Sequence, residues 1–445
     1  MTLNTFDHGI HPEYFKDFTA KKAIEKAPIP KRVIIPLQQH IGAPCQPLVK
    51  KKDEVIEGQK IGDVKAFISA PVHASISGKV KDIGKYPYPG GGKVVSVVIE
   101  GDGTSSGFSQ EGEASLDLES LTPEDIRDKV REAGIVGMGG AGFPTHVKLT
   151  PPDGKKVGTL IINGCECEPY LNADYRMMLE DTKKLLRGIL SIMKVVGAEK
   201  AYIGVEVNKL DAIDKVRAEI EPYPNIKVVP LDVKYPQGAE KMLIKAILNK
   251  KVPLGRLPLD VDVLVSNVGT AIAIYDALRY SRPLIERVVT VAGAAIKEPK
   301  NLLVRVGTSL REVIDVCGGM VDGQHKVIMG GPLMGVAQGD LSVPVVKGTS
   351  GIVALMKDDI QPGEYNRCIR CAACVDVCPV YLMPLKIADF GNFHRLEQFE
   401  AFGGMACIEC GCCSFVCPSK RPLVQWIRIG KARLREAKQK ETKAA

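Results

Sequence analysis

Hydrophobic residues in the first hundred positions come in short runs that glycine and proline interrupt. Residues 32–37 and 94–99 are rich in valine and isoleucine, which is typical of β-strands. Gly58 and Gly78 lie between them, and residues 87–92 form a proline- and glycine-rich cluster. Short apolar runs with this punctuation predict a small all-β unit in the N-terminal quarter of the chain.

Two segments of this unit, residues 54–62 (EVIEGQKIG) and 69–80 (SAPVHASISGKV), resemble the barrel-sandwich fold of lipoyl and biotinyl carriers. Those carriers modify a lysine at a hairpin tip, whereas the corresponding residues here, 70–75, include no lysine. The resemblance therefore implies a barrel-sandwich-like domain over residues 1–110 without a swinging-arm function. The Gly/Ser/Glu-rich residues 102–120 that follow are typical of a linker.

A helix and a buried strand follow the linker. Thr122 and Pro123 are a cap and a first-turn proline, and Gly134 marks the end of the helix. Residues 159–162 (TLII) predict a strand that ends at the polar Asn163. Polar residues at the carboxyl end of a buried strand lie where α/β sheets bind ligands. We therefore expect an α/β domain, which covers residues 120–285.

The pattern changes again in residues 286–345. Residues 288–293 and 301–307 are apolar, β-branched runs that predict two strands. Ser309 and Glu312 then form a capping box at the start of a helix, and Gly318 marks its end. The result is a β-β-α unit.

Most of the formal charge of +8 lies at the C-terminus, because residues 420–445 hold nine Lys or Arg and two Glu. Leu423, Trp426, Ile427 and Leu434 recur at helical spacing, which predicts a helix with one packed face and basic residues outside. The basic face is either a solvated helix end or a contact for an acidic partner or anionic lipid headgroups. No nucleic-acid partner is expected, because no RNA- or DNA-binding motif accompanies the charge.

Two copies of C-x2-C-x2-C-x3-C-P, at residues 368–379 and 407–418, carry the clearest chemistry. In two-cluster ferredoxins with this spacing, the fourth cysteine ligates the other cluster. One [4Fe–4S] cluster would therefore bind to Cys368, Cys371, Cys374 and Cys417, and the second to Cys407, Cys410, Cys413 and Cys378. A pair of four-cysteine zinc sites is the alternative, but zinc gains nothing from a third cysteine or a trailing proline. Two adjacent clusters would carry single electrons in series.

Cysteine content and apolar runs indicate the cellular compartment and whether the chain crosses a membrane. Thirteen cysteines and no apolar N-terminal export signal favour reduced thiols and the cytosol. The longest apolar run, residues 261–277, is interrupted by Asp262, Asn267 and Asp276. We therefore expect no transmembrane helix and a soluble or peripheral protein.

Residues 137–148 (GMGGAGFPTHVK) form a glycine-rich loop after the first helix. A dinucleotide fingerprint needs a strand before such a loop, whereas here a helix precedes it and Pro144 interrupts it. The functional interpretation is that the glycines let backbone N–H groups approach a phosphate or an isoalloxazine ring, with Lys148 as a fixed positive charge. A plain glycine-rich turn is the alternative.

Four segments, in the same order, resemble the flavin- and nicotinamide-binding segments of the 51-kDa NADH-dehydrogenase subunit of respiratory complex I: residues 137–148, 163–169 (NGCECEP), 235–240 (YPQGAE) and 266–270 (SNVGT). The resemblance implies a Rossmann-like domain that binds FMN and reacts with NAD(H). The cofactor-binding residues that it implies are Gly137, Gly139, Gly140, Gly142, Phe143, Lys148, Asn163, Glu166, Glu168, Tyr235, Gly238, Glu240, Asn267 and Thr270. Phe143 would stack on the nicotinamide or adenine unless it packs in the core, and Glu168 and Glu240 would bind the ribose or the nicotinamide amide.

Cys165, Ala239 and Ser266 depart from the pattern of that complex I protein, which also holds one cluster rather than a ferredoxin pair. A barrel-sandwich, a flavin domain and a double cluster in this order resemble the RnfC family, which belongs to the Rnf complex, a membrane-bound, ion-translocating ferredoxin:NAD oxidoreductase. The β-β-α unit at 286–345 is similar to the β-grasp (SLBB-like) module of these families, and residues 355–445 would form an α-helical ferredoxin-like domain. The corresponding protein of the sodium-pumping NADH:quinone reductase shares much of this layout but lacks the cluster cysteines.

The Rnf resemblance implies an electron-transfer subunit held peripherally on the cytoplasmic face of the membrane by other Rnf subunits. It would exchange electrons between NAD(H) and, through a partner subunit, ferredoxin. Hydride transfer at FMN needs no catalytic side chain. Two other functions stay open on the sequence: a flavin diaphorase subunit of a soluble hydrogenase or dehydrogenase, and a non-enzymatic adaptor in which only the clusters relay electrons.

Overall fold

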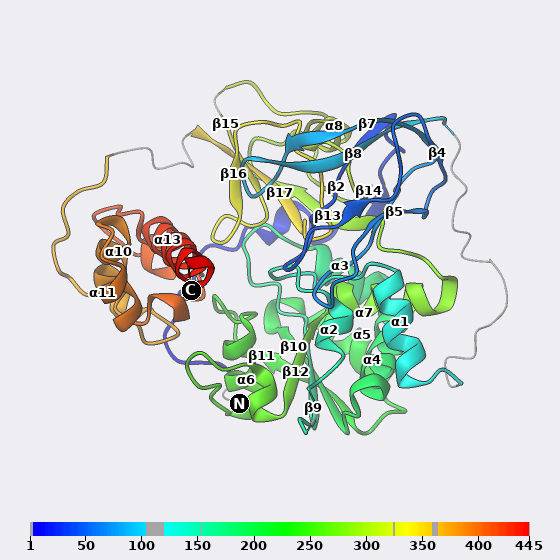
Figure 1. Cartoon of the computed structure of the whole chain (residues 1–445). Coiled ribbons are helices and arrows are strands. Elements are labelled where there is room, and N and C mark those ends of the chain that lie inside the picture. Colours follow the sequence, from blue (N-terminus) through cyan, green and yellow to red (C-terminus); the bar gives the residue numbers. More distant parts are fainter. Residues whose placement is uncertain (1–2, 104–119, 153, 324, 358–363, 445) are drawn as a thin grey trace.

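The computed structural model describes residues 3–103, 120–152, 154–323, 325–357 and 364–444. It has four parts, which we call the barrel domain, the α/β domain, the β-grasp sheet and the cysteine domain (Figure 1). The cysteine domain lies beside the α/β domain, on the side away from the barrel domain. Most of the predicted linker, 102–120, lies outside the described residues.

The barrel domain contains two small sheets, with the strand orders β2-β8-β7-β4 and β3-β5-β6. Val33 and Ile35 of β2, and Val97 and Ile99 of β8, are fully buried in one apolar core that both sheets share. The predicted barrel-sandwich is therefore confirmed. Its strands are β2 (Arg32–Pro36), β3 (Gln46–Pro47), β4 (Glu54–Val55), β5 (Lys60–Asp63), β6 (Val72–His73), β7 (Gly78–Pro87) and β8 (Lys93–Gly101).

The α/β domain is built on a parallel sheet in the order β11-β10-β9-β12. The predicted helix start is confirmed, because Thr122 caps the helix that begins at Pro123 and forms a capping box with Asp125. The carboxyl ends of the neighbouring strands β9 and β12 place Asn163 beside Asn267. The elements are α1 (Pro123–Glu132), α2 (Thr145–Lys148), β9 (Thr159–Asn163), α3 (Ala173–Glu180), α4 (Thr182–Val196), β10 (Lys200–Glu206), η2 (Val207–Lys209), α5 (Leu210–Ile220), β11 (Ile226–Leu231), α6 (Glu240–Leu248), η3 (Pro258–Val261), β12 (Val263–Asn267) and α7 (Val268–Tyr280).

The β-grasp sheet has the order β1-β14-β13-β17-β15-β16. Its predicted capping box between Ser309 and Glu312 is formed. The sheet reaches beyond the predicted range 286–345, because β17 inserts between β13 and β15 and β1 adds an edge strand from the N-terminus. The elements are β1 (Ile24–Lys26), β13 (Glu286–Ala292), β14 (Lys300–Arg305), α8 (Leu310–Val316), β15 (His325–Met329), β16 (Val336–Gln338) and β17 (Gly351–Met356).

Residues 3–26, with the short helix η1 (Lys16–Phe18), lie outside the barrel sheets, although we expected them within the N-terminal domain 1–110. Ile10 forms a β-bridge with Tyr235 of the α/β domain. Gly9 donates its N–H to the carbonyl of Val377 in the cysteine domain (3.1 Å). The segment therefore ties the α/β domain, the cysteine domain and the β-grasp sheet together.

The cysteine domain consists of short helices packed on the long helix α13. The predicted C-terminal helix is confirmed, since Leu423, Trp426, Ile427 and Leu434 are all buried. The elements are α9 (Ala373–Asp376), α10 (Pro384–Asn392), α11 (Leu396–Ala401), η5 (Gly404–Ala406), α12 (Cys412–Phe415) and α13 (Leu423–Ala444). None of the helices in the described part of the chain combines the length and apolar character needed to cross a bilayer.

Candidate functional site

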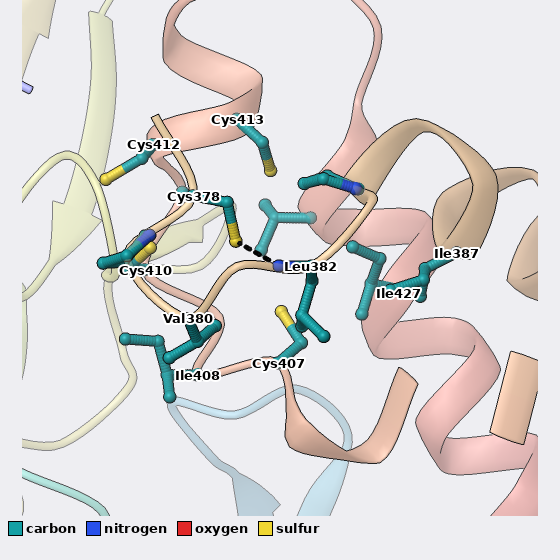
Figure 2. Close-up of a pocket in the computed structure, with 14 residues that line it drawn as sticks. Cys378, Val380, Leu382, Ile387, Cys407, Ile408, Cys410, Cys412, Cys413 and Ile427 are labelled. Carbon is teal, nitrogen blue, oxygen red and sulfur yellow. Dashed lines mark hydrogen bonds between the residues drawn. The ribbon is translucent and has the colours of Figure 1, made fainter. Parts of the chain in front are cut away.

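One cavity of the cysteine domain, which we call the inner cavity, is lined by five cysteines: Cys378, Cys407, Cys410, Cys412 and Cys413. Cys378 comes from the first repeat and the other four from the second. Figure 2 shows Cys378, Cys407, Cys410 and Cys413 around a common space. Apolar residues complete the wall: Val380, Leu382, Ile387, Ile408, Val424 and Ile427.

A second cavity, the outer cavity, is lined by Cys368, Cys371, Cys374 and Cys417. Three of these cysteines come from the first repeat and Cys417 from the second. The structure thus brings together the same two groups of four that the crossed spacing rule defines. The two cavities differ in exposure: Cys368 and Cys371 are exposed, whereas Cys378, Cys410 and Cys413 are buried.

The backbone around both cavities favours cysteine thiolates. The N–H groups of Arg370, Leu382 and Glu409 donate to the sulfurs of Cys368, Cys378 and Cys407, each at 3.4 Å. Burial raises the pKa of the Cys407 thiol to about 11, so this thiolate needs a bound cation to form near neutral pH. Sulfur donors in an apolar wall with N–H···S contacts fit iron–sulfur clusters.

The glycine-rich loop is anchored on the N-terminus of α7. The N–H of Met138 donates to Thr270 Oγ1 (3.0 Å), and the N–H of Gly137 donates to the carbonyl of Phe143 (2.8 Å). Asn267 caps α7, with Oδ1 accepting from the N–H of Gly269 at 2.8 Å. The loop therefore approaches the positive end of a helix dipole, which attracts phosphate.

The loop leaves room for a ligand on one side. Gly139 is exposed, and its Cβ side is closed: its φ is +80°, and a Cβ there would lie 2.8 Å from Asn267 Nδ2. Gly140 is exposed and faces open space, with no atom within 4 Å of a Cβ position. Phe143 is half-buried, and Gly142 is buried against the backbone of Gln39 and His40 in the barrel domain. The backbone at Gly139 and Gly140 is thus accessible.

The strand-end residues mainly hold this region in shape. Asn163 Nδ2 donates to the carbonyl of Gly238 (2.8 Å) and so joins two of the four predicted segments. Glu166 has a φ of +44°, and its carboxylate accepts the N–H groups of Asp174 and Tyr175 at the start of α3. These two side chains are committed to protein partners.

Lys148 and Glu240, both predicted to contact cofactor or substrate, form an ion pair of 2.9 Å and are each about one-third exposed (36% and 38%). They lie near enough to the surface to exchange partners when a ligand enters. Sequence analysis did not single out the half-buried Asp174 and the buried Arg287 behind the glycine loop. Asp174 accepts from Asn267 Nδ2 (2.6 Å), and burial raises its pKa to about 7. Burial lowers the pKa of Arg287 to about 10.

Glu168, predicted to bind the ribose or the nicotinamide amide, lies beside a loop of the β-grasp sheet. Its half-buried side chain accepts the N–H groups of Leu333 (3.1 Å) and Met334 (2.8 Å). The hydroxyl of Tyr235 also points to it (3.4 Å) and donates to the carbonyl of Cys410 at 2.8 Å. Glu168 and Tyr235 therefore form the joint between the α/β domain, the β-grasp sheet and the inner cavity, and the ligand contact of Glu168 stays a prediction.

Lys16 supports the same joint and was also missed by sequence analysis. Its Nζ donates to the carbonyls of Glu166 (2.7 Å), Glu168 (2.8 Å) and Leu171 (2.5 Å). Burial lowers its pKa to about 8. A single lysine in a polar N-terminal segment carries no sequence signal for this role.

Four family models match consecutive parts of the chain. They are the RnfC barrel sandwich hybrid domain (residues 4–104), the Nuo51 FMN-binding domain (130–276), the SLBB domain (288–337) and the 4Fe-4S dicluster domain (367–421). The expected fold classes and the cofactors FMN and [4Fe–4S] are thereby confirmed.

Full-length relatives decide the family. The chain is 49% identical, over 99% of its length and 96% of the relative's, to the C subunit of the proton-translocating ferredoxin:NAD(+) oxidoreductase complex of Clostridium ljungdahlii. It is 46% identical to the Na(+)-translocating counterpart of Acetobacterium woodii, with 96% of each chain covered. The chain belongs to the RnfC family. The resemblance found in the sequence is confirmed.

A solved structure, an NAD+-reducing [NiFe]-hydrogenase in the H2-reduced state, shares the fold. Its TM-score is 0.50 at 17% identity, with 71% of this chain and 66% of that one covered. At this identity the likeness concerns the fold alone.

The glycine-rich loop fits an FMN phosphate and ring. It is open at Gly139 and Gly140, a helix terminus lies beneath it, and Lys148 lies at its side.

Proposed function

We propose that this RnfC-family protein exchanges electrons between NAD(H) and ferredoxin, with FMN, the inner cluster and the outer cluster in series and with partner subunits at the far end. The names of the two relatives support NAD(H) and ferredoxin as the substrates, since both relatives belong to ferredoxin:NAD(+) oxidoreductase complexes. By the same names, the complex moves protons in one relative and sodium ions in the other. We assign ion translocation to the assembled complex.

The observation that carries this proposal is the direct contact between the predicted flavin segments and the inner cavity. Tyr235 belongs to the segment 235–240, and its hydroxyl donates to the carbonyl of the proposed ligand Cys410 at 2.8 Å. Ile10, Cys167, Tyr235, Cys410 and Cys412 form one buried apolar cluster at this contact. The inner cluster is therefore the one next to the flavin.

The order of carriers matches what each can transport. Bound FMN supplies the conversion between single electrons and the hydride that NAD accepts. The protein's own part is to hold the phosphate at the glycine loop and α7, to keep water away from the inner cysteines, and to pack Tyr235 between the two sites. Arg287 is buried behind the loop with its Nη1 against Met138 Sδ (2.6 Å), and the half-buried Asp174 accepts a hydrogen bond from Asn267.

The test is electron flow in the isolated, FMN- and iron-loaded chain. Both clusters are reduced photochemically with a deazaflavin, and NAD+ is then added in the dark. We expect the reduced-cluster EPR signals to disappear while NADH forms, with one NADH for every two electrons. Clusters that stay reduced in the presence of NAD+ and retained FMN would reject the proposed series.

We also propose attachment to the cytoplasmic face of the membrane through partner subunits, with the basic end of α13 as one contact. Lys438 and Lys440 on this end are exposed. Exposed charge pairs are screened beyond about 8–10 Å at physiological ionic strength, and this screening distance shortens as salt is added. High salt should therefore release the protein from membranes, as measured by immunoblotting of washed membranes.

Truncation gives the second arm of that experiment. The chain should be truncated after Ala437, so that the residues that hold α13 in the cysteine domain are kept. Lys431 bonds to Glu409 (2.8 Å), and Leu434 is buried. We expect weaker attachment and unchanged NADH oxidation by ferricyanide, which needs the flavin domain alone. Attachment that neither salt nor truncation changes would show that another surface holds the protein.

A further inference from the structure

The two cysteine cavities face different surroundings. The inner cavity faces other parts of the protein: the hydroxyl of Tyr235 donates to the carbonyl of its lining residue Cys410, and the backbone of Leu333 lies against Gly411. The outer cavity opens to solvent, since Cys368 and Cys371 are exposed and every residue from Glu364 to Ala372 is exposed as well. A cluster in the outer cavity would thus have an edge at the protein surface.

The surface around that edge combines apolar and cationic side chains. Ile369 lies between the two exposed cysteines in sequence and is 68% exposed, and Tyr365 is 56% exposed. Arg367, Arg370 and Lys420 are exposed cations, and the ion pairs found in the described part of the chain include none of them. We call these five residues the outer patch.

The outer patch is held in place by the backbone. The N–H of Asn366 donates to the carbonyl of Ser419 (2.9 Å), and Ser419 Oγ donates to the carbonyl of Arg367 (3.0 Å). This double contact brings Lys420 beside Arg367, although they are far apart in sequence. Arg421 differs, because it is buried and paired with Asp389 (2.6 Å). The three cations of the patch are therefore left to face solvent.

We propose that the outer patch is the docking surface for the redox partner: an acidic protein with its own one-electron centre near its surface. This inference rests on the proposed function, since it assigns the far end of the same electron path. Unpaired cations around an apolar centre favour a partner with complementary negative charge. One electron passes between the partner's centre and the outer cluster; no bond forms and no proton moves.

Binding of a surrogate partner tests the patch without electron transfer. The probe is an acidic, oxidised two-cluster bacterial ferredoxin, titrated into the full-length loaded chain by calorimetry at low and high salt. The patch variant carries Arg367→Glu, Arg370→Glu and Lys420→Glu. The matched control carries Lys79→Glu, Lys85→Glu and Lys93→Glu on β7 and β8, three exposed lysines of the barrel domain.

At low salt, we expect the dissociation constant for ferredoxin to rise at least about tenfold in the patch variant, because the complementary charge is reversed. In the control it should change less than about twofold. In stopped flow, the rate constant for outer-cluster reduction by reduced ferredoxin should fall in parallel. Reduction by a small uncharged deazaflavin radical should be unchanged. Equal losses in the two variants, or unaltered binding in the patch variant, would overturn the proposal.

The two proposals can fail separately. If the loaded chain accepts electrons from ferredoxin at the patch but does not pass them to NAD+, the proposed function fails while the docking surface stands. If NAD+ is reduced by photochemically reduced clusters but the patch variant binds ferredoxin like the wild type, the docking surface alone is wrong.

Discussion

Replacing Cys378 by serine is expected to remove the inner cluster while sparing the outer one. Cys378 follows the outer-cavity ligands Cys368, Cys371 and Cys374 in sequence, yet its side chain lines the inner cavity with the second repeat (Figure 2). Bound iron should fall from about eight to about four per chain, since each [4Fe–4S] cluster needs its fourth ligand. EPR should retain the signal of the outer cluster, and electron flow to NAD+ should stop.

Cys412→Ser is the matched control for this experiment. Cys412 is buried next to Cys413, and Figure 2 shows its sulfur directed away from those of Cys378, Cys407 and Cys413. Its thiol lies beside that of Cys410 and contacts the carbonyl of Tyr235 at 4.0 Å. The same chemical change one residue from a ligand should leave both clusters in place. Loss of the outer cluster in Cys378→Ser would contradict the crossed assignment, and loss of the inner cluster in the control would assign Cys412 as a ligand.

The local parts of the fold could be predicted because they rest on near neighbours in sequence. The cap at Thr122, the capping box at Ser309 and the apolar face of α13 all involve residues within a few positions of each other. The cysteine groups could also be predicted, although Cys378 and Cys413 come from different repeats, because the proline after the fourth cysteine directs it to the other cluster.

Long-range pairing explains what the sequence did not reveal. β17 lies in the centre of the β-grasp sheet between β13 and β15. The short apolar run that forms it does not indicate which strands it pairs with. Glu168 is the clearest case: its carboxylate accepts the N–H groups of Leu333 and Met334, which lie far along the chain. The motif around Glu168 predicts a ligand contact but does not signal this long-range contact, which only the three-dimensional packing shows.

Gly140→Val is expected to release FMN while leaving about eight irons bound, because the cluster ligands lie on a separate segment. Gly140 is exposed, and no protein atom lies within 4 Å of a Cβ at this position. A valine can therefore be accommodated by the fold, and its methyl groups would occupy the space that the ring or phosphate needs. Flavin fluorescence after extraction should show FMN content falling at least about tenfold.

Two further variants separate a local block from general damage. Gly158 also faces open space at the start of the domain's central strand, so Gly158→Val should keep its flavin. Lys148→Ala should weaken FMN binding by at least about tenfold, because a charge-assisted hydrogen bond contributes about 1.5–3 kcal/mol. The substitution also frees Glu240 from its 2.9 Å ion pair. Full flavin in both Gly140→Val and Lys148→Ala would place the FMN site elsewhere, and flavin loss in Gly158→Val would attribute the effect to unfolding.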